Sequence, residues 1–328
     1  MLEEATRIEV SAAPPPTGVA DEDFLTVALL DEATGRRGAP VFGTYTQVNG
    51  RLVFHPRFAL APGARYRISA GGEFLDHQVP VRALATATTV ESVSPAAGEV
   101  PANLLKFYLS FSRPMREGRE IFDHIHLLDE AGQPIPAPWR DTELWTEDAR
   151  RLTLWIHPGR VKRGVNLREE FGPVLRPGKA YTLLVDATLR DAAGQPLARE
   201  FRHRFRTSTE AHARLDLAAW TLEAPSAGTR DPLRVVATMP LDAAVARRAL
   251  HVRNSGGEEM PGVAALADDG RIWTFTPRDP WPATPLQYVA DPWLEDLAGN
   301  TLARVFDDDL TATKPEPLPQ TQRSFTPR

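Results

Sequence analysis

Two histidines separated by a single residue have the spacing in this sequence that best suits a metal site. His124 and His126 would lie on the same face of a β-strand, because side chains alternate between the two faces. His157 or Asp123 could supply a further ligand for a transition metal. Alternate polar residues more simply form the wet face of a strand, so we expect no metal and no other cofactor.

Carboxylates at three places could offer oxygen ligands to calcium. These are Asp191, Asp296 and the run 307–309, which reads Asp-Asp-Asp. None of them has the spacing of an EF-hand loop. Asp191 and Asp296 each begin an Asp-x-Ala-Gly sequence that is typical of a turn, and a solvated edge accounts for the run.

The seven tryptophans suggest a different chemistry, because an indole face can cover the apolar face of a sugar ring. Trp155 lies out of phase with the apolar residues Leu154 and Ile156, so it is the candidate for an exposed, sugar-binding position. Trp273 lies at a strand position that is typical of a core.

Basic side chains gather in residues 159–172, which read GRVKRGVNLREEFG. The cations are Arg160, Lys162, Arg163 and Arg168. If they converged on open solvent they could bind carboxylates or an anionic polymer. The alternative is a brace between domains, in which the arginines pair with acids of a neighbouring module and the apolar residues Val161, Val165, Leu167 and Phe171 are buried. Four large apolar residues favour the brace, because a loop built only to bind anions would leave them in water.

Sequence motifs of catalysis are missing. The chain has no Gly-x-Ser-x-Gly elbow, no phosphate-binding glycine loop, no His-Glu-x-x-His and no cysteine. The formal net charge of -5 provides no global attraction to nucleic acid or to an anionic membrane. No apolar run approaches the length of a membrane span, and the first residues do not resemble a signal peptide. We therefore expect a protein that is not an enzyme.

The elements that would hold these residues recur three times along the chain. An apolar strand ends in a proline at Pro56, Pro158 and Pro277. Proline has no N–H to donate to a β-ladder, so it ends the strand at the same place in each copy. Short strands with turn signals every 8 to 12 residues or so are typical of a β-sandwich.

A tyrosine follows each proline, after a Pro-Gly turn in the first two copies. The separation is 10 residues to Tyr66 (from 56), 23 to Tyr181 (from 158) and 11 to Tyr288 (from 277). The second copy therefore carries an insertion of about a dozen residues, which is the basic segment 159–172. We expect the Tyr181 hydroxyl to bond to the backbone near Pro177 and Gly178, as in a tyrosine corner.

Together these motifs resemble a known family. Residues 94–101 (SPAAGEVP), Phe-Ser-x-Pro-Met at 111–115, Leu-x-Pro-Gly-x-x-Tyr at 175–181 and Asp-x-Ala-Gly-x-x-Leu at 191–197 are similar to the SbsA-type bacterial Ig-like domain of S-layer and other envelope proteins. The second copy matches from end to end, the third in its second half, and the first from about Phe24 onward. The resemblance implies a secreted or envelope location and provides no catalytic residues.

The sequence thus predicts an all-β chain of tandem Ig-like β-sandwiches. We place the modules at residues 1–88, 89–208 and 209–313, followed by a disordered tail at 314–328, with helix limited to short turns such as 242–248. The leading function is a non-enzymatic spacer, scaffold or adhesion surface of the cell envelope, with a protein or cell-wall glycan as partner. A carbohydrate-binding accessory module and an enzyme with a site at a domain junction are the alternatives.

Overall fold

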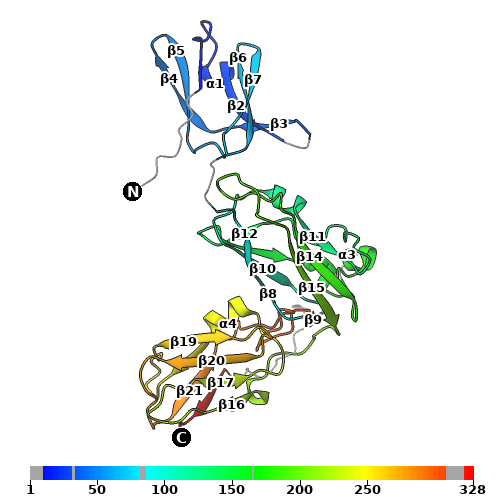
Figure 1. Ribbon diagram of the computed structural model, residues 1–328, viewed down its shortest axis with the longest axis vertical. Helices are drawn as coiled ribbons and strands as arrows, with labels where there is room; N and C mark the ends of the chain where they lie inside the picture. Colours follow the sequence, from blue (N-terminus) through cyan, green and yellow to red (C-terminus); the bar gives the residue numbers. More distant parts are fainter. Residues whose placement is uncertain (1–9, 32–33, 82–85, 165, 308–320) are drawn as a thin grey trace. The chain divides into compact units, whose positions relative to one another are not determined.

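The predicted all-β architecture is confirmed in a computed structural model of the chain (Figure 1). The structure describes residues 10–31, 34–81, 86–164, 166–307 and 321–328. Their strands form six sheets, which are arranged in three pairs along the chain, and helices are limited to single turns or two. By their contacts the residues form two compact units. The first comprises residues 1–89 with the loops 112–117 and 187–199, and the second comprises the rest.

The first sandwich has a four-stranded and a three-stranded sheet, in the orders β3-β2-β6-β7 and β1-β5-β4. Its elements are β1 (Val10–Ala12), α1 (Asp21–Phe24), β2 (Leu25–Leu30), β3 (Arg37–Pro40), β4 (Gly43–Val48), β5 (Arg51–Pro56), β6 (Arg65–Ala70) and β7 (Glu73–Gln78). Leu25 of one sheet and Phe54 of the other are both buried in a shared core. This core is what a strand pair needs in order to be stable in water.

The second sandwich has two four-stranded sheets, β12-β13-β10-β8 and β11-β14-β15-β9. Its strands are β8 (Val90–Ser94), β9 (Glu99–Pro101), β10 (Lys106–Phe111), β11 (Ile125–Leu128), β12 (Leu144–Trp145), β13 (Arg151–Trp155), β14 (Ala180–Val185) and β15 (Phe201–Ser208), with a 3-10 turn at Arg119–Asp123. The alternation predicted for β10 is confirmed, since Phe107, Leu109 and Phe111 are buried. Phe107 packs on Phe205 of the other sheet, with ring centroids 5.4 Å apart.

The inserted segment 159–172 contains two short helices, α2 (Pro158–Val161) and α3 (Asn166–Phe171). Proline at the first position of α2 loses no helical hydrogen bond, and His157 caps this helix, because its Nδ1 accepts from Gly159 N at 3.2 Å. The sequence indicated a loop here, since neither helix is long enough to show a helical period.

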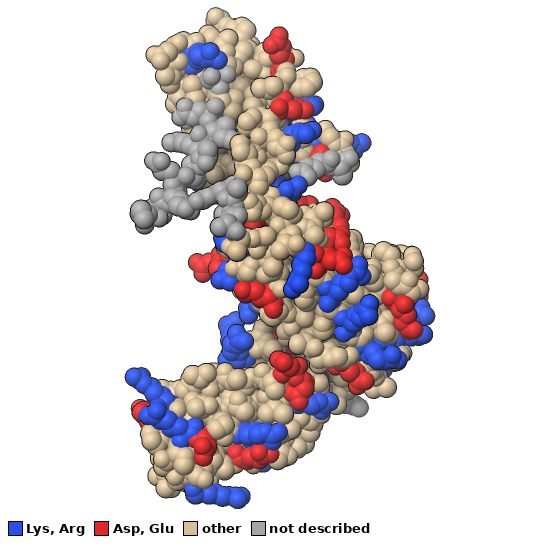
Figure 2. Space-filling view, in the orientation of Figure 1, with Lys and Arg blue, Asp and Glu red and all other residues tan. Residues whose placement is uncertain are grey.

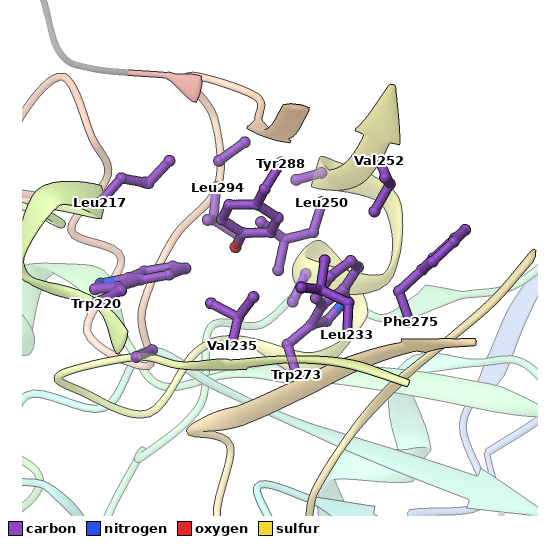
Figure 3. Close-up of a cluster of buried hydrophobic side chains, with 14 of the residues drawn as sticks. Leu217, Trp220, Leu233, Val235, Leu250, Val252, Trp273, Phe275, Tyr288 and Leu294 are labelled. Atoms are coloured by element: carbon purple, nitrogen blue, oxygen red, sulfur yellow. The ribbon is translucent and has the colours of Figure 1, made fainter. Parts of the chain in front are cut away.

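The third sandwich pairs the sheets β16-β17-β20-β19 and β18-β21-β22. Its elements are a 3-10 turn at Leu217–Ala219, β16 (Thr221–Glu223), β17 (Leu233–Val236), α4 (Ala243–Ala249), β18 (Leu250–Arg253), β19 (Gly262–Leu266), β20 (Ile272–Pro277), β21 (Leu286–Ala290) and β22 (Gln322–Phe325). Trp220, Trp273 and Tyr288 meet between the sheets (Figure 3). The short helix expected at 242–248 is α4, which is capped by the side chain of Asp242.

The expectation of a disordered tail at 314–328 is wrong for its last residues. Strand β22 pairs with β21 in antiparallel register, with Phe325 opposite Leu286, and Phe325 is buried. Residues 314–320 lie outside the described residues. Four residues after a proline-rich segment are too few to show a strand period, so the sequence did not reveal that this strand completes the third sandwich.

Two of the three tyrosine corners form as expected. The Tyr181 hydroxyl accepts a hydrogen bond from Arg176 N at 2.9 Å, next to the Pro-Gly turn, which confirms the prediction. Tyr66 accepts in the same way from Ala61 N at 3.0 Å. The third copy differs, because the hydroxyl of Tyr288 is buried without a hydrogen-bond partner among the described residues.

The hydrogen bonds of the two Asp-x-Ala-Gly turns recur in two further turns, which begin at Asp129 and Asn254. The Oδ1 atoms of Asp191 and Asp296 each accept two backbone N–H groups of their own turn, as turn chemistry predicted. Asp129 and Asn254 do the same, and all four turns have a glycine with positive φ at the fourth position. The carboxylates of Asp191 and Asp296, the two calcium candidates, therefore stabilise their own turns.

Candidate functional site

The basic insertion 159–172 directs its cations toward the protein's own groups. Arg160 is buried, and its guanidinium donates to Pro136 O at 2.7 Å and to Gly172 O at 3.1 Å. Burial lowers the pKa of Arg160. Lys162 lies over the ring of Phe306, with Nζ 4.7 Å from the centroid.

Glu210, in the segment between the second and third sandwiches, is the point on which the other two cations converge. Arg163 Nη2 lies 2.8 Å from one of its oxygens, Arg168 bonds to the other, and His212 Nε2 lies 3.0 Å away. Burial alone would raise the pKa of Glu210, but these hydrogen bonds outweigh it and lower the pKa to about 2. The backbone N–H of Arg163 also donates to Asp307 at 2.8 Å.

This geometry is that of a brace rather than of a loop open to an anion. We call Arg163, Arg168, Glu210, His212 and Asp307 the brace network. The apolar residues agree only in part: Val161 is buried and Leu167 is half-buried, but Phe171 is 61% exposed, contrary to expectation. Val165 lies outside the described residues.

Trp155 lies beside a cation instead of on an open sugar platform. It is half-buried, and Lys106 Nζ lies 4.9 Å from the centroid of its ring. Of the seven tryptophans, all within the described residues, four are buried, Trp145 and Trp155 are half-buried, and Trp293 is exposed. The seven tryptophans form no exposed row on a sheet, and such a row is what a sugar-stacking surface would need.

A buried ionic cluster, whose members all belong to the second unit, joins the second and third sandwiches. Lys106 projects from the outer face of β10, where the alternation predicted a solvated residue, yet its side chain is only 8% exposed. Its Nζ lies 3.3 Å from Asp242 Oδ2 and bonds to Glu295. Tyr108, two residues along β10, donates to Asp242 at 2.9 Å. We call these four residues the junction cluster.

Each carboxylate of the junction cluster has a distinct environment. Asp242 also caps α4, where Oδ1 accepts Ala244 N and Val245 N at 3.0 Å. Burial raises the pKa of Glu295, while the charge of Lys106 opposes that rise. Burial, and secondarily the charge of Asp242, raises the pKa of Tyr108 well above its ordinary range, so its hydroxyl remains a donor. The cluster is an ion pair with supporting hydrogen bonds.

Close backbone packing surrounds the junction cluster. Leu105 N donates to Leu297 O at 3.0 Å, and a side chain on Gly299 would overlap Leu105. The side chains of Asn103 and Asn300 both donate to the carbonyl of Ala211, at 2.8 and 3.0 Å. The two sandwiches are thus held by apolar, polar and ionic contacts together.

The candidate metal ligands do not converge. His126 lies 3.0 Å from Asp186, and no group of three metal-binding side chains is found within the described part of the chain. Asp307 belongs to the brace network, and Asp308 and Asp309 lie outside the described residues. Likewise, none of the described helices is both long and apolar enough to cross a membrane.

Sequence reasoning missed the junction cluster because its members are far apart in the chain. From the sequence, Lys106 was expected to be an outward, solvated residue of an alternating strand, and Asp242 was expected to begin a short helix. The sequence showed only that Lys106 and Tyr108 share one face of an alternating strand, and the pairing of β10 with β13 places Trp155 on that same face.

Comparison with known proteins does not assign the chain to a family. No family model matches the sequence, and no curated protein matches it. Solved structures with similarity include native α2-macroglobulin of E. coli (12% identity, TM-score 0.26, 51% of this chain and 8% of that one) and the N-terminal part of the bacterial S-layer protein SbsC (13%, 0.25, 63% and 40%). The N-terminal eight Ig domains of Down syndrome cell adhesion molecule are also similar (13%, 0.17, 89% and 37%).

The chain therefore spans 8% of the α2-macroglobulin chain, 40% of the SbsC chain and 37% of the cell adhesion molecule chain. TM-scores this low do not place two proteins in one family, and they carry no functional argument. The assignment of an Ig-like fold rests on the sheets of this chain.

Proposed function

We propose that this protein is a non-enzymatic scaffold of the cell envelope, in which the second and third sandwiches act as one stiff spacer. The observation that supports this function most directly is the junction cluster. Withdrawing a lysine and two carboxylates from water costs desolvation free energy, which their mutual attraction offsets only if all three are held in place. Modules that moved freely relative to each other would not hold them in place. The brace network supports the same connection at a second point.

The envelope location rests on the resemblance of residues 94–101 and 175–197 to SbsA-type modules, and it is part of the proposal. Antibody detection after fractionation of the native cells tests it. Recovery with the envelope or the medium is expected, and recovery only with cytosolic proteins would overturn the location.

The stiff-spacer role is tested by Lys106→Met in the full chain. Methionine fills a similar volume but leaves Asp242 and Glu295 without their cation, so we expect a loss of about 3 kcal/mol in the free energy of unfolding. We also expect faster tryptic cleavage at Arg214, in the segment between the two sandwiches. The matched control is Lys179→Met, which removes a cation of the same module whose pair with Glu130 is exposed.

Two outcomes would reject the spacer role. Cleavage at Arg214 that is as slow in Lys106→Met as in the unaltered chain would show that the junction is held without the cluster. Equal effects of Lys106→Met and Lys179→Met would show that only the loss of one charge matters.

A further inference from the structure

Strand β15 carries three arginines in a row on the exposed face of its sheet. Arg202, Arg204 and Arg206 alternate with residues that face the core, among them Phe205, which stacks on Tyr181. All three arginines are exposed. Figure 2 shows Lys and Arg side chains gathered over the part of the second unit that Figure 1 labels β14 and β15.

These arginines are less engaged than those of the basic insertion. Arg202 pairs with Glu200 at 2.7 Å, where both side chains are about half exposed to solvent. Arg206 donates to Gly178 O at 3.3 Å, and the side chain of Arg204 has no hydrogen-bond or ion-pair partner among the described residues. In contrast, Arg160 and Arg168 of the insertion are largely buried against the protein's own oxygens. The guanidinium groups of β15 are therefore more accessible to an external anion than those of Arg160 and Arg168.

The spacing of the row suits a repeating anion. Positions two residues apart on a strand are separated by about 6.8 Å, so the α-carbons of Arg202 and Arg206 lie about 14 Å apart, with Arg204 between them. Like charges at this distance repel one another, and a negatively charged polymer lying along the strand would remove that repulsion. Guanidinium groups bind carboxylates through paired hydrogen bonds, which gives geometric preference as well as charge attraction.

We propose that the outer face of β15 binds a linear acidic polysaccharide, whose carboxylates pair with Arg202, Arg204 and Arg206. This inference rests on the proposed envelope function, since it names the surface polymer that the scaffold would contact. The three arginines follow one extended strand, which matches the course of an extended polymer chain. The net charge of -5 opposes long-range attraction of a dense polyanion such as duplex DNA, so a carboxylate polymer of lower charge density is favoured.

The test is binding of the full chain to immobilised polygalacturonate at 50 mM salt. Arg202→Gln, Arg204→Gln and Arg206→Gln are combined in one variant. The matched control combines Arg230→Gln, Arg247→Gln and Arg278→Gln, three exposed arginines of the third sandwich. Both variants shift the formal net charge from -5 to -8, so they differ only in where the charge is lost. Thermal unfolding of both variants checks that the fold is kept.

We expect the dissociation constant for polygalacturonate to rise roughly tenfold or more in the β15 variant and by less than about twofold in the control. Polyphosphate, duplex DNA and neutral dextran serve as comparison probes. Absent binding of the unaltered chain, equal losses in the two variants, or tighter binding to DNA or polyphosphate than to polygalacturonate would each overturn it.

The same measurement on Lys106→Met separates this proposal from the stiff-spacer role. The β15 face does not include Lys106, so that variant keeps its affinity if the polysaccharide site is real. Faster cleavage at Arg214 in Lys106→Met with retained binding supports both proposals. Unchanged cleavage with retained binding would reject only the spacer role. Faster cleavage in Lys106→Met, together with absent binding of the unaltered chain, would reject only the polysaccharide site.

Discussion

At the scale of single residues, the same residue type at equivalent positions has different roles in the three sandwiches. Tyr66 and Tyr181 each accept a backbone N–H, whereas the Tyr288 hydroxyl lies buried among apolar and aromatic side chains (Figure 3). The cause is the segment before the tyrosine. The first two copies have a Pro-Gly turn there, while the third has Trp281, which is itself buried.

This difference predicts opposite results for one substitution. Tyr181→Phe removes a part-buried hydrogen bond and leaves the N–H of Arg176 without this partner, so we expect a loss of about 1 kcal/mol in the free energy of unfolding. Tyr288→Phe removes a hydroxyl that has no partner to lose, so stability should be unchanged or slightly higher. Urea denaturation of both variants measures the contrast, and equal losses at the two positions would contradict the corner assignment.

At the scale of elements, the third sandwich depends on a strand that the chain contributes late. This strand is β22, which follows β21 only after a segment of more than thirty residues. Phe325 enters the core beside Trp281, with ring centroids 5.9 Å apart, and Arg323 donates to the carbonyl of Leu217 at 3.0 Å. A strand that fills a core position is part of the folding unit.

Phe325→Ala is therefore expected to destabilise the third sandwich by about 3 kcal/mol, since it opens a cavity in a packed core. Ser324→Ala, at the adjacent and exposed position of the same strand, is the control and should be close to neutral. Chemical unfolding followed by tryptophan fluorescence reports on the second and third sandwiches, and the third contributes Trp220, Trp273, Trp281 and Trp293. A neutral Phe325→Ala would show that β22 is dispensable.

At the scale of the second unit, the junction cluster and the brace network hold two sandwiches together by electrostatic contacts of different kinds. The junction cluster is withdrawn from water, and its carboxylates meet one lysine. The brace network is partly solvated, and one carboxylate, Glu210, meets two arginines and a histidine. Only the brace holds a carboxylate whose pKa is strongly lowered.

The pKa of Glu210 predicts an acid-dependent loss of stability. Because the folded pKa of about 2 lies below the ordinary value for glutamate, its contribution is present above about pH 4.5 and is lost as the pH falls toward 2. Glu210→Gln should be less stable at pH 6 and should lose less on acidification to pH 3. Glu130→Gln, which breaks an exposed pair, is the control. Parallel pH profiles for the unaltered chain and Glu210→Gln would contradict the assignment.

The sequence by itself determined the elements whose rules are local. Alternation of apolar residues, prolines at strand ends, Asp-x-Ala-Gly turns and the Tyr181 corner each depend on a few neighbouring residues, and short-range sterics and hydrogen bonding decide their conformation. These features were enough to predict tandem Ig-like sandwiches and to locate the insertion 159–172.

Only the tertiary structure decided which side chains meet. Lys106 lies more than a hundred residues before Asp242 and Glu295 in the chain, and no local pattern relates the three residues. The same is true of Arg168 and Glu210, and of β22 and its core position. Packing of one sandwich on another changes a strand's outer face from solvated to buried, so the burial and the partners of Lys106 follow from that packing and not from its place in an alternating strand.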